Sequence, residues 1–405
     1  MSPAGQLWQP SDFPASWLRA SCQCSSCLDP GSGQRLARIA DRPAEVRVGE
    51  VTQDPRDDGT VRVTFEPDGH RGVFALSWLA AAWQPTAAPR TEDAKRLWSA
   101  ADFAAGQPQG RWERYLRDPE HRAACLTSLL TDGFVLLRDV PAVPGTVLAV
   151  ARSMGYVRET NYGLLFDVRA KVDPANLAYT ALAIAPHTDN PYRDPVPTVQ
   201  LLHCLASAAE GGDSGLVDGF AAASTLRAES PSAFATLAST PVTFAYADST
   251  AELRATMPLI GLDPRGLIRE IRFNNRSMQP LPLRPAAGPA AAAREADAFY
   301  GACLAFAEIL SRPELMVTFR LDPGDCAVFD NTRVLHARTA FTAAGNRHLQ
   351  GCYADLDGVA STLAVIGRRS GPAAGPAGQA GRAGPAGAGP VDEPITTRSH
   401  GDDEH

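Results

Sequence analysis

The chain has 405 residues, of which 44% are hydrophobic and 20% charged, which is enough for two domains with a sizeable core. Its 38 basic and 45 acidic residues are interspersed without a Lys/Arg stripe and give a net charge of −7, which argues against a nucleic-acid partner. We find no apolar run of the roughly 20 residues that span a bilayer, and no secretion signal, so we expect a cytoplasmic protein without a membrane span.

The first part of the chain, residues 1–92, is expected to form a small β-rich domain and a linker. Residues 45–48 and 60–65 are rich in β-branched residues, and 60–65 alternate apolar and polar positions, which predicts strands. The Pro- and Ala-rich stretch 84–92 has the composition of a linker. A unit of this size buries little core, so it needs a further source of stability.

Three cysteines near the start of this unit are a candidate metal site. Cys22, Cys24 and Cys27 fall in one short segment, and His70, the one histidine of the unit, follows a Pro-Asp-Gly turn. Three thiolates and one imidazole match the closed, tetrahedral set of a structural zinc site. In a chain without an export signal a disulfide framework is the weaker interpretation. Three reduced thiols and a surface histidine remain the alternative.

A larger domain is expected over residues 93–367. Helical spacing of apolar residues predicts helices over 144–154 and 291–310, and the rest is predicted to be mostly short strands. The Gly/Ala/Pro-rich and then acidic residues 368–405 have the composition of a disordered tail.

Near the end of this domain, three predicted strands lead to a histidine. Residues 316–321 are followed by an Asp-Pro-Gly-Asp turn, the strand 326–329, an Asp-Asn turn and the strand 334–336. His336 therefore lies on or beside a strand.

The segment His187-Thr188-Asp189, together with the distant His336 and Arg347, points to the chemistry. Two neutral imidazoles and one carboxylate can hold one face of an octahedral Fe(II) and leave the other face open. A planar guanidinium at Arg347 can bind the distal carboxylate of a 2-oxo acid through two parallel hydrogen bonds. The order and spacing indicate a non-haem oxygenase that uses Fe(II), 2-oxoglutarate and O2. Because Asp189 is present, halide has no vacant ligand position, and halogenation is disfavoured.

Other polar residues fit structural roles better. His203 and Cys204 lie in an apolar strand and are expected in the core. His348 should point away from Arg347 if both lie on one strand. Asp213 and Asp218 are expected to be turn residues.

Several separate strings give the chain a family resemblance. They are Trp17-Leu18-Arg19, Asn176-Leu177-Ala178-Tyr179-Thr180, His187-Thr188-Asp189, Gln200-Leu201-Leu202-His203-Cys204, Gly211-Gly212-Asp213-Ser214, Val217-Asp218-Gly219-Phe220, Arg272-Phe273-Asn274-Asn275 and Arg347-His348-Leu349-Gln350-Gly351-Cys352-Tyr353-Ala354-Asp355. From about residue 17 to 357 the chain resembles the γ-butyrobetaine and trimethyllysine dioxygenases, within the wider taurine-dioxygenase-like group.

The resemblance implies a mainly β fold with flanking helices, in which a double-stranded β-helix (jelly-roll) catalytic domain follows a small zinc-binding domain, and it implies a homodimer. It assigns Fe(II) to His187, Asp189 and His336, and 2-oxoglutarate to Arg347 with help from Ser214. The implied zinc ligands are Cys22, Cys24, Cys27 and His70.

The resemblance also implies a pocket for a small trimethylammonium substrate. A quaternary cation has no hydrogen to donate, so aromatic faces recognise it best. Tyr162, Tyr179 and Tyr353 stand at positions of the cage walls, and Asn176 and Asn275 at positions that hold the substrate carboxylate.

Two departures from the family pattern affect this pocket. Phe166 replaces a cage Trp and offers a weaker cation site, and Asn190 replaces an aromatic residue after the metal-binding Asp. The expected activity is hydroxylation of an unactivated C–H bond in a γ-butyrobetaine-like compound. The alternatives are the same chemistry on another cationic or amino-acid-like substrate of a specialised pathway, and a catalytically silent, zinc-stabilised binding protein.

Overall fold

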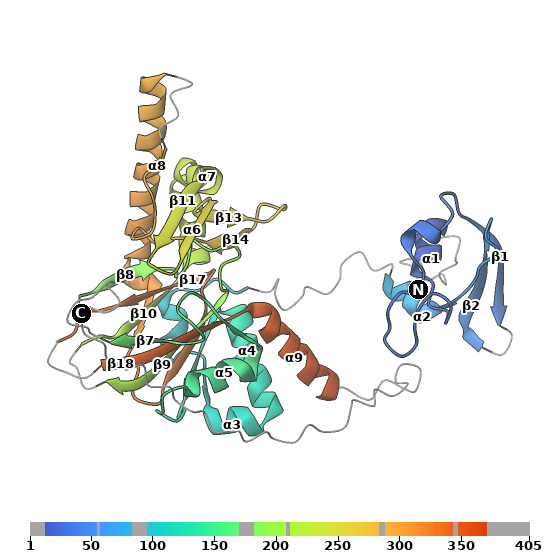
Figure 1. The fold of residues 1–405 in the computed structure, drawn as a ribbon, viewed down its shortest axis with the longest axis horizontal. Coiled ribbons are helices and arrows are strands. Elements are labelled where there is room, and N and C mark those ends of the chain that lie inside the picture. The colour runs from blue at the N-terminus through green and yellow to red at the C-terminus, as the bar shows by residue number, and fades with distance from the viewer. Residues whose placement is uncertain are drawn as a thin grey trace. The chain divides into compact units, whose positions relative to one another are not determined.

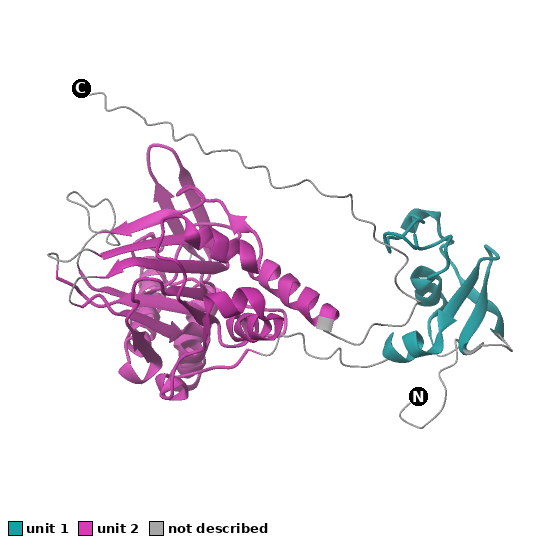
Figure 2. Ribbon diagram, turned by 90° about the horizontal axis from the view of Figure 1, so that it is seen from below, with its two compact units in different colours: residues 1–87, 372–405 teal, residues 88–371 magenta. Residues whose placement is uncertain are grey.

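The computed structural model describes residues 13–54, 57–82, 95–169, 182–207, 211–282, 288–342 and 347–370. These residues fall into two compact units, one within residues 1–87 and one within residues 88–371 (Figure 2). The expected linker 84–92 and nearly all of the expected tail lie outside the described residues.

The smaller unit is a three-stranded antiparallel sheet flanked by short helices. In chain order it contains α1 (Ala15–Ser21), η2 (Ile39–Asp41), β1 (Arg47–Asp54), β2 (Asp57–Glu66), β3 (Arg71–Ala75) and α2 (Leu76–Ala82). The alternation predicted for 60–65 is confirmed, because Val61, Val63 and Phe65 of β2 are buried against Leu18 of α1 and Leu79 of α2.

The larger unit is built on two sheets. The seven-stranded sheet has the order β4 (Gln109–Arg111), β5 (Phe134–Arg138), β16 (Cys326–Asp330), β9 (Val199–Ser207), β18 (Arg347–Ala354) and β6 (Val157–Arg158), and β7 (Phe166–Arg169) also pairs with β18. The four-stranded sheet has the order β15 (Met316–Phe319), β10 (Ser214–Asp218), β17 (Val334–Arg338) and β8 (Ile184–His187). All pairs except β4 with β5 are antiparallel.

The predicted strands near residue 336 are confirmed, and they alternate between the sheets. β15 and β17 belong to the four-stranded sheet, whereas β16 between them belongs to the seven-stranded one. The two sheets share an apolar core that includes Phe134, Leu216, Phe319, Phe329 and Val334. This exchange of consecutive strands between two facing layers is the jelly-roll arrangement expected from the sequence.

Helices cover the outer faces of both sheets, as Figure 1 shows. The seven-stranded sheet packs on α3 (Trp112–Arg117), α4 (Pro119–Thr131), α5 (Thr146–Met154) and α9 (Leu356–Ser370). Beside the four-stranded sheet lie α6 (Gly219–Glu229), α7 (Pro231–Ser239), α8 (Pro289–Leu310) and the hairpins β11 (Val242–Ala247) with β12 (Glu252–Met257) and β13 (Ile260–Leu262) with β14 (Ile268–Ile271). The turns η3 (Ala100–Phe103) and η6 (Pro313–Leu315) complete the unit.

The helices predicted over 144–154 and 291–310 are confirmed as α5 and α8, and short strands occur elsewhere as expected, but the prediction was incomplete. It missed α3, α4, α6, α7 and α9, so the unit is mixed α/β around jelly-roll sheets. Of these helices, α4 and α6 lack a pronounced apolar stripe, so packing on the sheets stabilises them more than their own pattern does.

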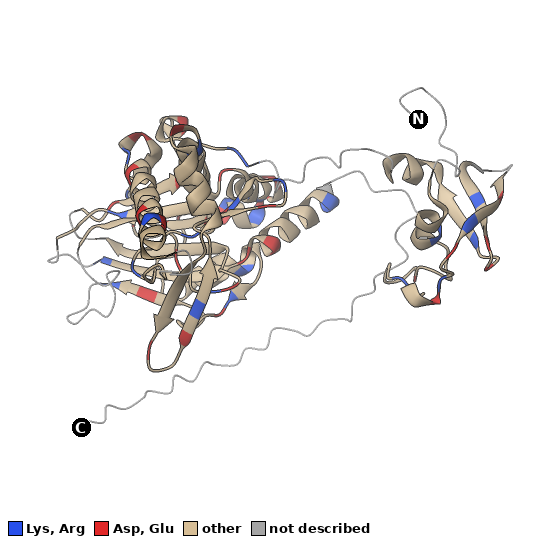
Figure 3. Cartoon of the chain, turned by 90° about the horizontal axis from the view of Figure 1, so that it is seen from above, with Lys and Arg blue, Asp and Glu red and all other residues tan. Residues whose placement is uncertain are grey.

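The surface of the described parts carries mixed charge. Figure 3 shows Lys/Arg and Asp/Glu interspersed along the elements of both units. Across the described residues, every helix falls short of the length or the apolarity needed for a bilayer crossing.

A buried ion pair lies at one end of the four-stranded sheet. Asp218, expected as a turn residue, ends β10, caps the N-terminus of α6 and accepts Arg333 Nε at 3.0 Å and Nη2 at 2.8 Å. Both side chains are fully inaccessible to solvent. Arg333 also donates to the carbonyl oxygens of Thr131 and Arg96, and Asp218 accepts from the Trp98 amide. The pair thus joins the sheet to the segment around residue 96 and to α4.

Replacing Asp218 with Asn should leave an uncompensated guanidinium in the core. We expect Asp218→Asn to lower the free energy of unfolding by about 3 to 5 kcal/mol, measured by urea titration with far-UV circular dichroism. The matched control is Glu229→Gln, which breaks the exposed pair with Arg312 and should barely change the midpoint. Equal midpoints for Asp218→Asn and wild type would contradict this account.

Candidate active site

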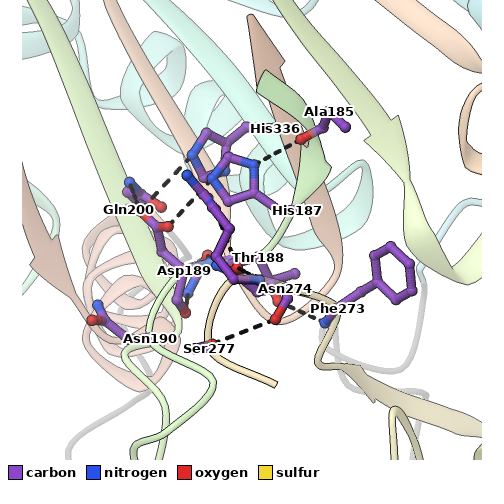
Figure 4. Close-up of polar contacts among 12 residues, drawn as sticks. Ala185, His187, Thr188, Asp189, Asn190, Gln200, Phe273, Asn274, Ser277 and His336 are labelled. Carbon is purple, nitrogen blue, oxygen red and sulfur yellow. Dashed lines mark hydrogen bonds and ion pairs between the residues drawn. The ribbon is translucent and has the colours of Figure 1, made fainter. Parts of the chain in front are cut away.

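The two sheets of the larger unit enclose a cavity of about 530 Å³. Its walls come from β7, β9 and β18 on one side and from β8, β10 and β17 on the other, and the segment 274–277 and β11 close part of it. Polar residues gather around one point of this cavity, which Figure 4 shows in close-up.

That point is the expected iron site. Strand pairing places His336 of β17 directly opposite His187 of β8, with ring centroids 4.1 Å apart. Asp189 follows two residues after His187, and its Oδ1 lies 3.4 Å from His187 Nε2 while its Oδ2 lies 3.8 Å from His336 Nε2. The three ligand atoms lie within 4.8 Å of one another, so the sequence-predicted residues do come together.

The protonation of the three side chains suits a divalent metal. His187 Nδ1 lies 2.9 Å from the Ala185 carbonyl oxygen, which accepts its hydrogen and leaves the Nε2 lone pair directed at the site. Burial, and then the charge of His187, lower the pKa of His336 to about 3, so its imidazole is neutral. Burial opposes ionisation of Asp189, but the hydrogen bond with His187, and the charge that His336 carries when it is protonated at low pH, outweigh burial and hold the pKa of Asp189 well below the usual range. Two neutral imidazoles and one carboxylate form the facial set that fits Fe(II).

Neighbouring polar side chains hold the carboxylate ligand in place. Gln200 Nε2 donates to Asp189 Oδ2 at 2.8 Å, and the Tyr353 hydroxyl donates to the same oxygen at 3.3 Å. The fully buried Asn331 accepts from the Asp189 amide at 2.8 Å and donates to the Asp189 carbonyl at 2.9 Å and to the Pro197 carbonyl at 3.1 Å. Asn331 thereby fixes the backbone that carries the ligand.

The residue between the two ligands is tied to a second segment. The Thr188 amide donates to the Phe273 carbonyl at 2.9 Å, and Thr188 Oγ1 accepts from the Phe273 amide at 3.0 Å. Asn274 Nδ2 donates to the Thr188 carbonyl at 3.0 Å. Residues 273–274 are therefore held directly against the iron site, as Figure 4 shows.

Arg347 and Ser214 both line the cavity, on β18 and β10. Arg347 is 8% exposed, and its guanidinium lies over the Phe341 ring, 5.4 Å from the centroid. Gly212, at φ +76°, allows this position because a Cβ there would lie only 3.1 Å from Arg347 Nε. Arg338 also lines the cavity, and burial, followed by the charges of Arg347 and Arg276, lowers its pKa to about 10.

Aromatic side chains line another wall. Phe166 stacks on Tyr353 with centroids 5.3 Å apart, and Tyr162 lies 6.0 Å from Phe166. Gly351 permits this packing, because a Cβ would fall 2.4 Å from the Phe166 ring. Tyr192 and Tyr246, which were not predicted, stack on each other at 5.1 Å, and the Tyr192 and Tyr162 hydroxyls lie 2.9 Å apart.

The remaining residues expected in the pocket are placed differently. Asn190 lines the cavity at φ +57°, accepts from the Tyr192 hydroxyl at 2.8 Å, and is 3% exposed. Asn275 is exposed, and among the described residues its neighbours Asn274 and Arg276 line the cavity instead. Asn176 and Tyr179 lie outside the described residues.

The structural residues behave as expected. His203 and Cys204 are buried, and His348 contacts Asp167 on β7 at 2.6 Å while Arg347, Leu349 and Tyr353 face the cavity. None of the eight cysteines, all of which lie within the described residues, forms a disulfide.

In the smaller unit, the four residues of the candidate zinc site lie together. His70 Nε2 is 3.3 Å from Cys22 Sγ, 3.6 Å from Cys24 Sγ and 3.4 Å from Cys27 Sγ. Tetrahedral zinc with ordinary bond lengths separates a thiolate from an imidazole nitrogen by about 3.5 Å. The donor set and its spacing therefore fit Zn²⁺, and the loop after α1 and the β2–β3 turn supply the ligands.

Sequence reasoning missed several cavity residues. Gln200 lies in one of the strings that carry the family resemblance and Asn331 in the turn before His336. Their contacts with Asp189 depend on strand pairing, which the sequence does not show. Tyr192, three residues after Asp189, could have been suggested by proximity, whereas Tyr246 and Arg276 reach the cavity only through the packing of β11 and the segment after β14.

Comparison with known proteins agrees with this geometry. Residues 99–353 match the family described as Taurine catabolism dioxygenase TauD, TfdA family, and residues 8–80 match Gamma-butyrobetaine hydroxylase-like, N-terminal. The chain is 37% identical to gamma-butyrobetaine dioxygenase of Pseudomonas sp. (strain AK-1), covering 88% of this chain and 91% of that protein. It is 33% identical to the human gamma-butyrobetaine dioxygenase (90% and 94% covered) and 28% identical to trimethyllysine dioxygenase of Meyerozyma guilliermondii (87% and 90% covered). The chain thus belongs to the TauD, TfdA family of Fe(II)- and 2-oxoglutarate-dependent oxygenases and carries a gamma-butyrobetaine hydroxylase-like N-terminal domain.

Proposed function

We propose that this protein hydroxylates an unactivated C–H bond of a small trimethylammonium compound resembling γ-butyrobetaine. The observation that carries the proposal is the aromatic wall formed by Tyr162, Phe166, Tyr192 and Tyr353 in the same cavity as the His187, Asp189 and His336 triad. The relatives named gamma-butyrobetaine dioxygenase support this choice of substrate.

In this proposal His187, Asp189 and His336 hold Fe(II). Bound iron supplies the activation of O2 that couples decarboxylation of 2-oxoglutarate to oxidation of the substrate. Gln200 and the Tyr353 hydroxyl share Asp189 Oδ2, so they orient the carboxylate while Oδ1 stays directed toward His187. Asn331 keeps Asp189 from moving with the loop, because it bonds both the amide and the carbonyl of that residue.

Arg347 is proposed to bind the distal carboxylate of 2-oxoglutarate, with Ser214 as a further donor. A guanidinium that is 8% exposed has lost most of its water, so a carboxylate partner restores favourable interactions. The contact with Phe341 limits its rotation. The co-substrate is thereby oriented with its other end toward the triad.

The aromatic wall is proposed to receive the quaternary ammonium group. Faces of Tyr and Phe attract a cation without needing a hydrogen bond, and the stacked rings restrict where the methyl groups can sit. Positioning one C–H bond near the metal while excluding water is the main contribution that the chain makes to catalysis.

The direct test is substrate-stimulated succinate formation with γ-butyrobetaine and related betaines. We expect turnover by the wild type and a loss of both Fe(II) binding and succinate formation in Asp189→Ala, because a ligand and its charge are removed. Asp297→Ala, on the exposed face of α8, serves as the matched control and should behave as wild type.

Failure of every quaternary ammonium compound to stimulate turnover would rule out this substrate class. Wild-type protein that binds no Fe(II) and decarboxylates no 2-oxoglutarate would instead favour the silent, zinc-stabilised binding protein.

A second candidate keeps the chemistry and changes the substrate. The buried Asn190 Nδ2 interacts with the Tyr353 hydroxyl but makes no hydrogen bond of ordinary geometry among the described residues, so it can donate to an acceptor atom of the substrate. Such a substrate is a different cationic or amino-acid-like compound.

Phe166→Trp separates these two candidates. Indole binds cations more strongly than a phenyl ring, so we expect the variant to raise the affinity for γ-butyrobetaine about 2- to 5-fold, measured as KM in the succinate assay. Phe166→Leu removes the π face and should therefore lower the affinity for γ-butyrobetaine. If neither change alters KM, the aromatic wall is not the ammonium site and the second candidate gains.

We further propose that Cys22, Cys24, Cys27 and His70 bind one structural zinc ion and that the protein is a homodimer. Zinc in such a set contributes directly to folding of a small domain. We expect one zinc per chain by elemental analysis, and loss of zinc with unfolding of the smaller unit in Cys27→Ser. The buried Cys125→Ser, outside the cluster, should retain zinc. Zinc-free wild type with an intact smaller unit would refute the assignment.

A further inference from the structure

The cavity carries more positive charge than its co-substrate needs. Among its described lining residues are three guanidinium groups, Arg276, Arg338 and Arg347, against the single carboxylate of Asp189. The two positive charges of Fe(II) and the two negative charges of 2-oxoglutarate cancel when both are bound. The described lining thus keeps an excess of two positive charges, which opposes a substrate that is only a cation.

Two of the three guanidinium groups have other roles. Arg347 is the proposed partner of 2-oxoglutarate. Arg338 donates Nη2 to the Leu182 carbonyl at 2.7 Å and lies over the Phe341 ring, 4.8 Å from its centroid. Both are nearly buried at 8% exposure. Arg276 differs from them because it is exposed to solvent while also lining the cavity.

Arg276 is held at the iron site by the segment that carries it. Its amide and its Nε both donate to Asn274 Oδ1, at 3.2 and 3.3 Å. Asn274 in turn donates to the carbonyl of Thr188, between the two iron ligands, and the next residue, Ser277, accepts from the Ala245 amide of β11 at 2.9 Å. Hydrogen bonds of Asn274 and Ser277 therefore fix the backbone on both sides of Arg276. The described hydrogen bonds of the Arg276 side chain use only Nε, so the two terminal nitrogens of the guanidinium are available to a ligand.

We propose that Arg276 binds an acid group of the substrate and is a specificity-determining residue. The substrate is then a zwitterion whose quaternary ammonium group meets the aromatic wall and whose carboxylate meets Arg276. This inference rests on the proposed function and narrows it, since it excludes cationic substrates without an acid group. It also transfers to Arg276 a role that the family resemblance assigned to Asn275, which is exposed outside the described cavity lining.

The test compares two quaternary compounds of similar length and a third probe, butyrate, on the anaerobic holoenzyme loaded with Fe(II) and 2-oxoglutarate. γ-Butyrobetaine carries a carboxylate and butyltrimethylammonium does not, and butyrate supplies the carboxylate alone. Binding is measured by calorimetry, so the readout does not depend on turnover. Arg276→Met removes the charge and keeps the length, Arg276→Lys keeps the charge, and Arg254→Met on β12 is the matched control.

We expect Arg276→Met to raise the Kd of γ-butyrobetaine about tenfold or more, and Arg276→Lys to restore part of the loss. The Kd of butyltrimethylammonium should stay the same or fall, because a repulsive charge is gone. The Kd of 2-oxoglutarate, titrated into the Fe(II)-loaded protein, should not change, and Arg254→Met should match the wild type.

Three results would overturn the assignment. Equal losses for both quaternary probes would show that Arg276 only positions the loop. A raised Kd of 2-oxoglutarate in Arg276→Met would assign Arg276 to the co-substrate, and no effect of Arg276→Met on any carboxylate probe would remove its role altogether.

The same measurements distinguish a failure of the proposed trimethylammonium substrate from a failure of the Arg276 assignment. If neither quaternary compound binds the wild type while butyrate does and loses affinity in Arg276→Met, the ammonium proposal fails and the role of Arg276 stands. If both quaternary compounds bind equally well in every variant, the reverse holds.

Discussion

The pairing of β8 with β17 is the constraint on which the rest of the site depends. It sets His187 opposite His336 on two strands that come from parts of the chain about 150 residues apart. Because side chains alternate along a strand, a register shift of one residue would turn one imidazole to the other face and remove the metal site. β17 also pairs with β10, and β10 carries both Ser214 at the cavity and Asp218 at the buried ion pair with Arg333. The apolar core between the sheets and this ion pair therefore both stabilise the register in which β17 pairs with β8 and β10.

Hydrogen bonds from side chains and loops hold Asp189, which the strand pairing does not hold. Asp189 lies beyond the end of β8, where no ladder hydrogen bonds hold it, and the chain compensates with Asn331, Gln200 and the Thr188–Phe273 bonds. Each of these partners comes from a different part of the sequence. The carboxylate ligand and its backbone are thus held by a hydrogen-bond network drawn from several segments, which is a condition for a preorganised metal site.

The cavity combines two kinds of recognition that usually exclude each other. Its lining offers aromatic faces, which suit a cation, and guanidinium groups, which suit anions. The two can serve one small molecule only if opposite charges occupy its two ends, and 2-oxoglutarate accounts for a single arginine. Asn190 places a polar side chain in the cavity beside the triad. Its backbone is in the left-handed region, which asparagine tolerates better than a bulky aromatic residue does.

The sequence by itself determined the chemistry. His187, Asp189, His336 and Arg347 could be proposed as an Fe(II) and 2-oxoglutarate site because metal and carboxylate binding restrict which side chains can serve. Cys22, Cys24, Cys27 and His70 could be proposed as a zinc site for the same reason. It also indicated α5, α8 and the strands around residue 336, whose apolar spacing is strong. The family resemblance also indicated Tyr162, Phe166, Asn190 and Tyr353, which line the cavity, but tertiary structure alone decided the rest of its substrate side. Tyr192, Tyr246 and Arg276 have no motif of their own, and Asn275 and Arg276 differ in their relation to the cavity although they are neighbours in the chain. Which side chain reaches a cavity depends on loop conformation and on packing between distant segments, and neither leaves a periodic or compositional signal in the sequence.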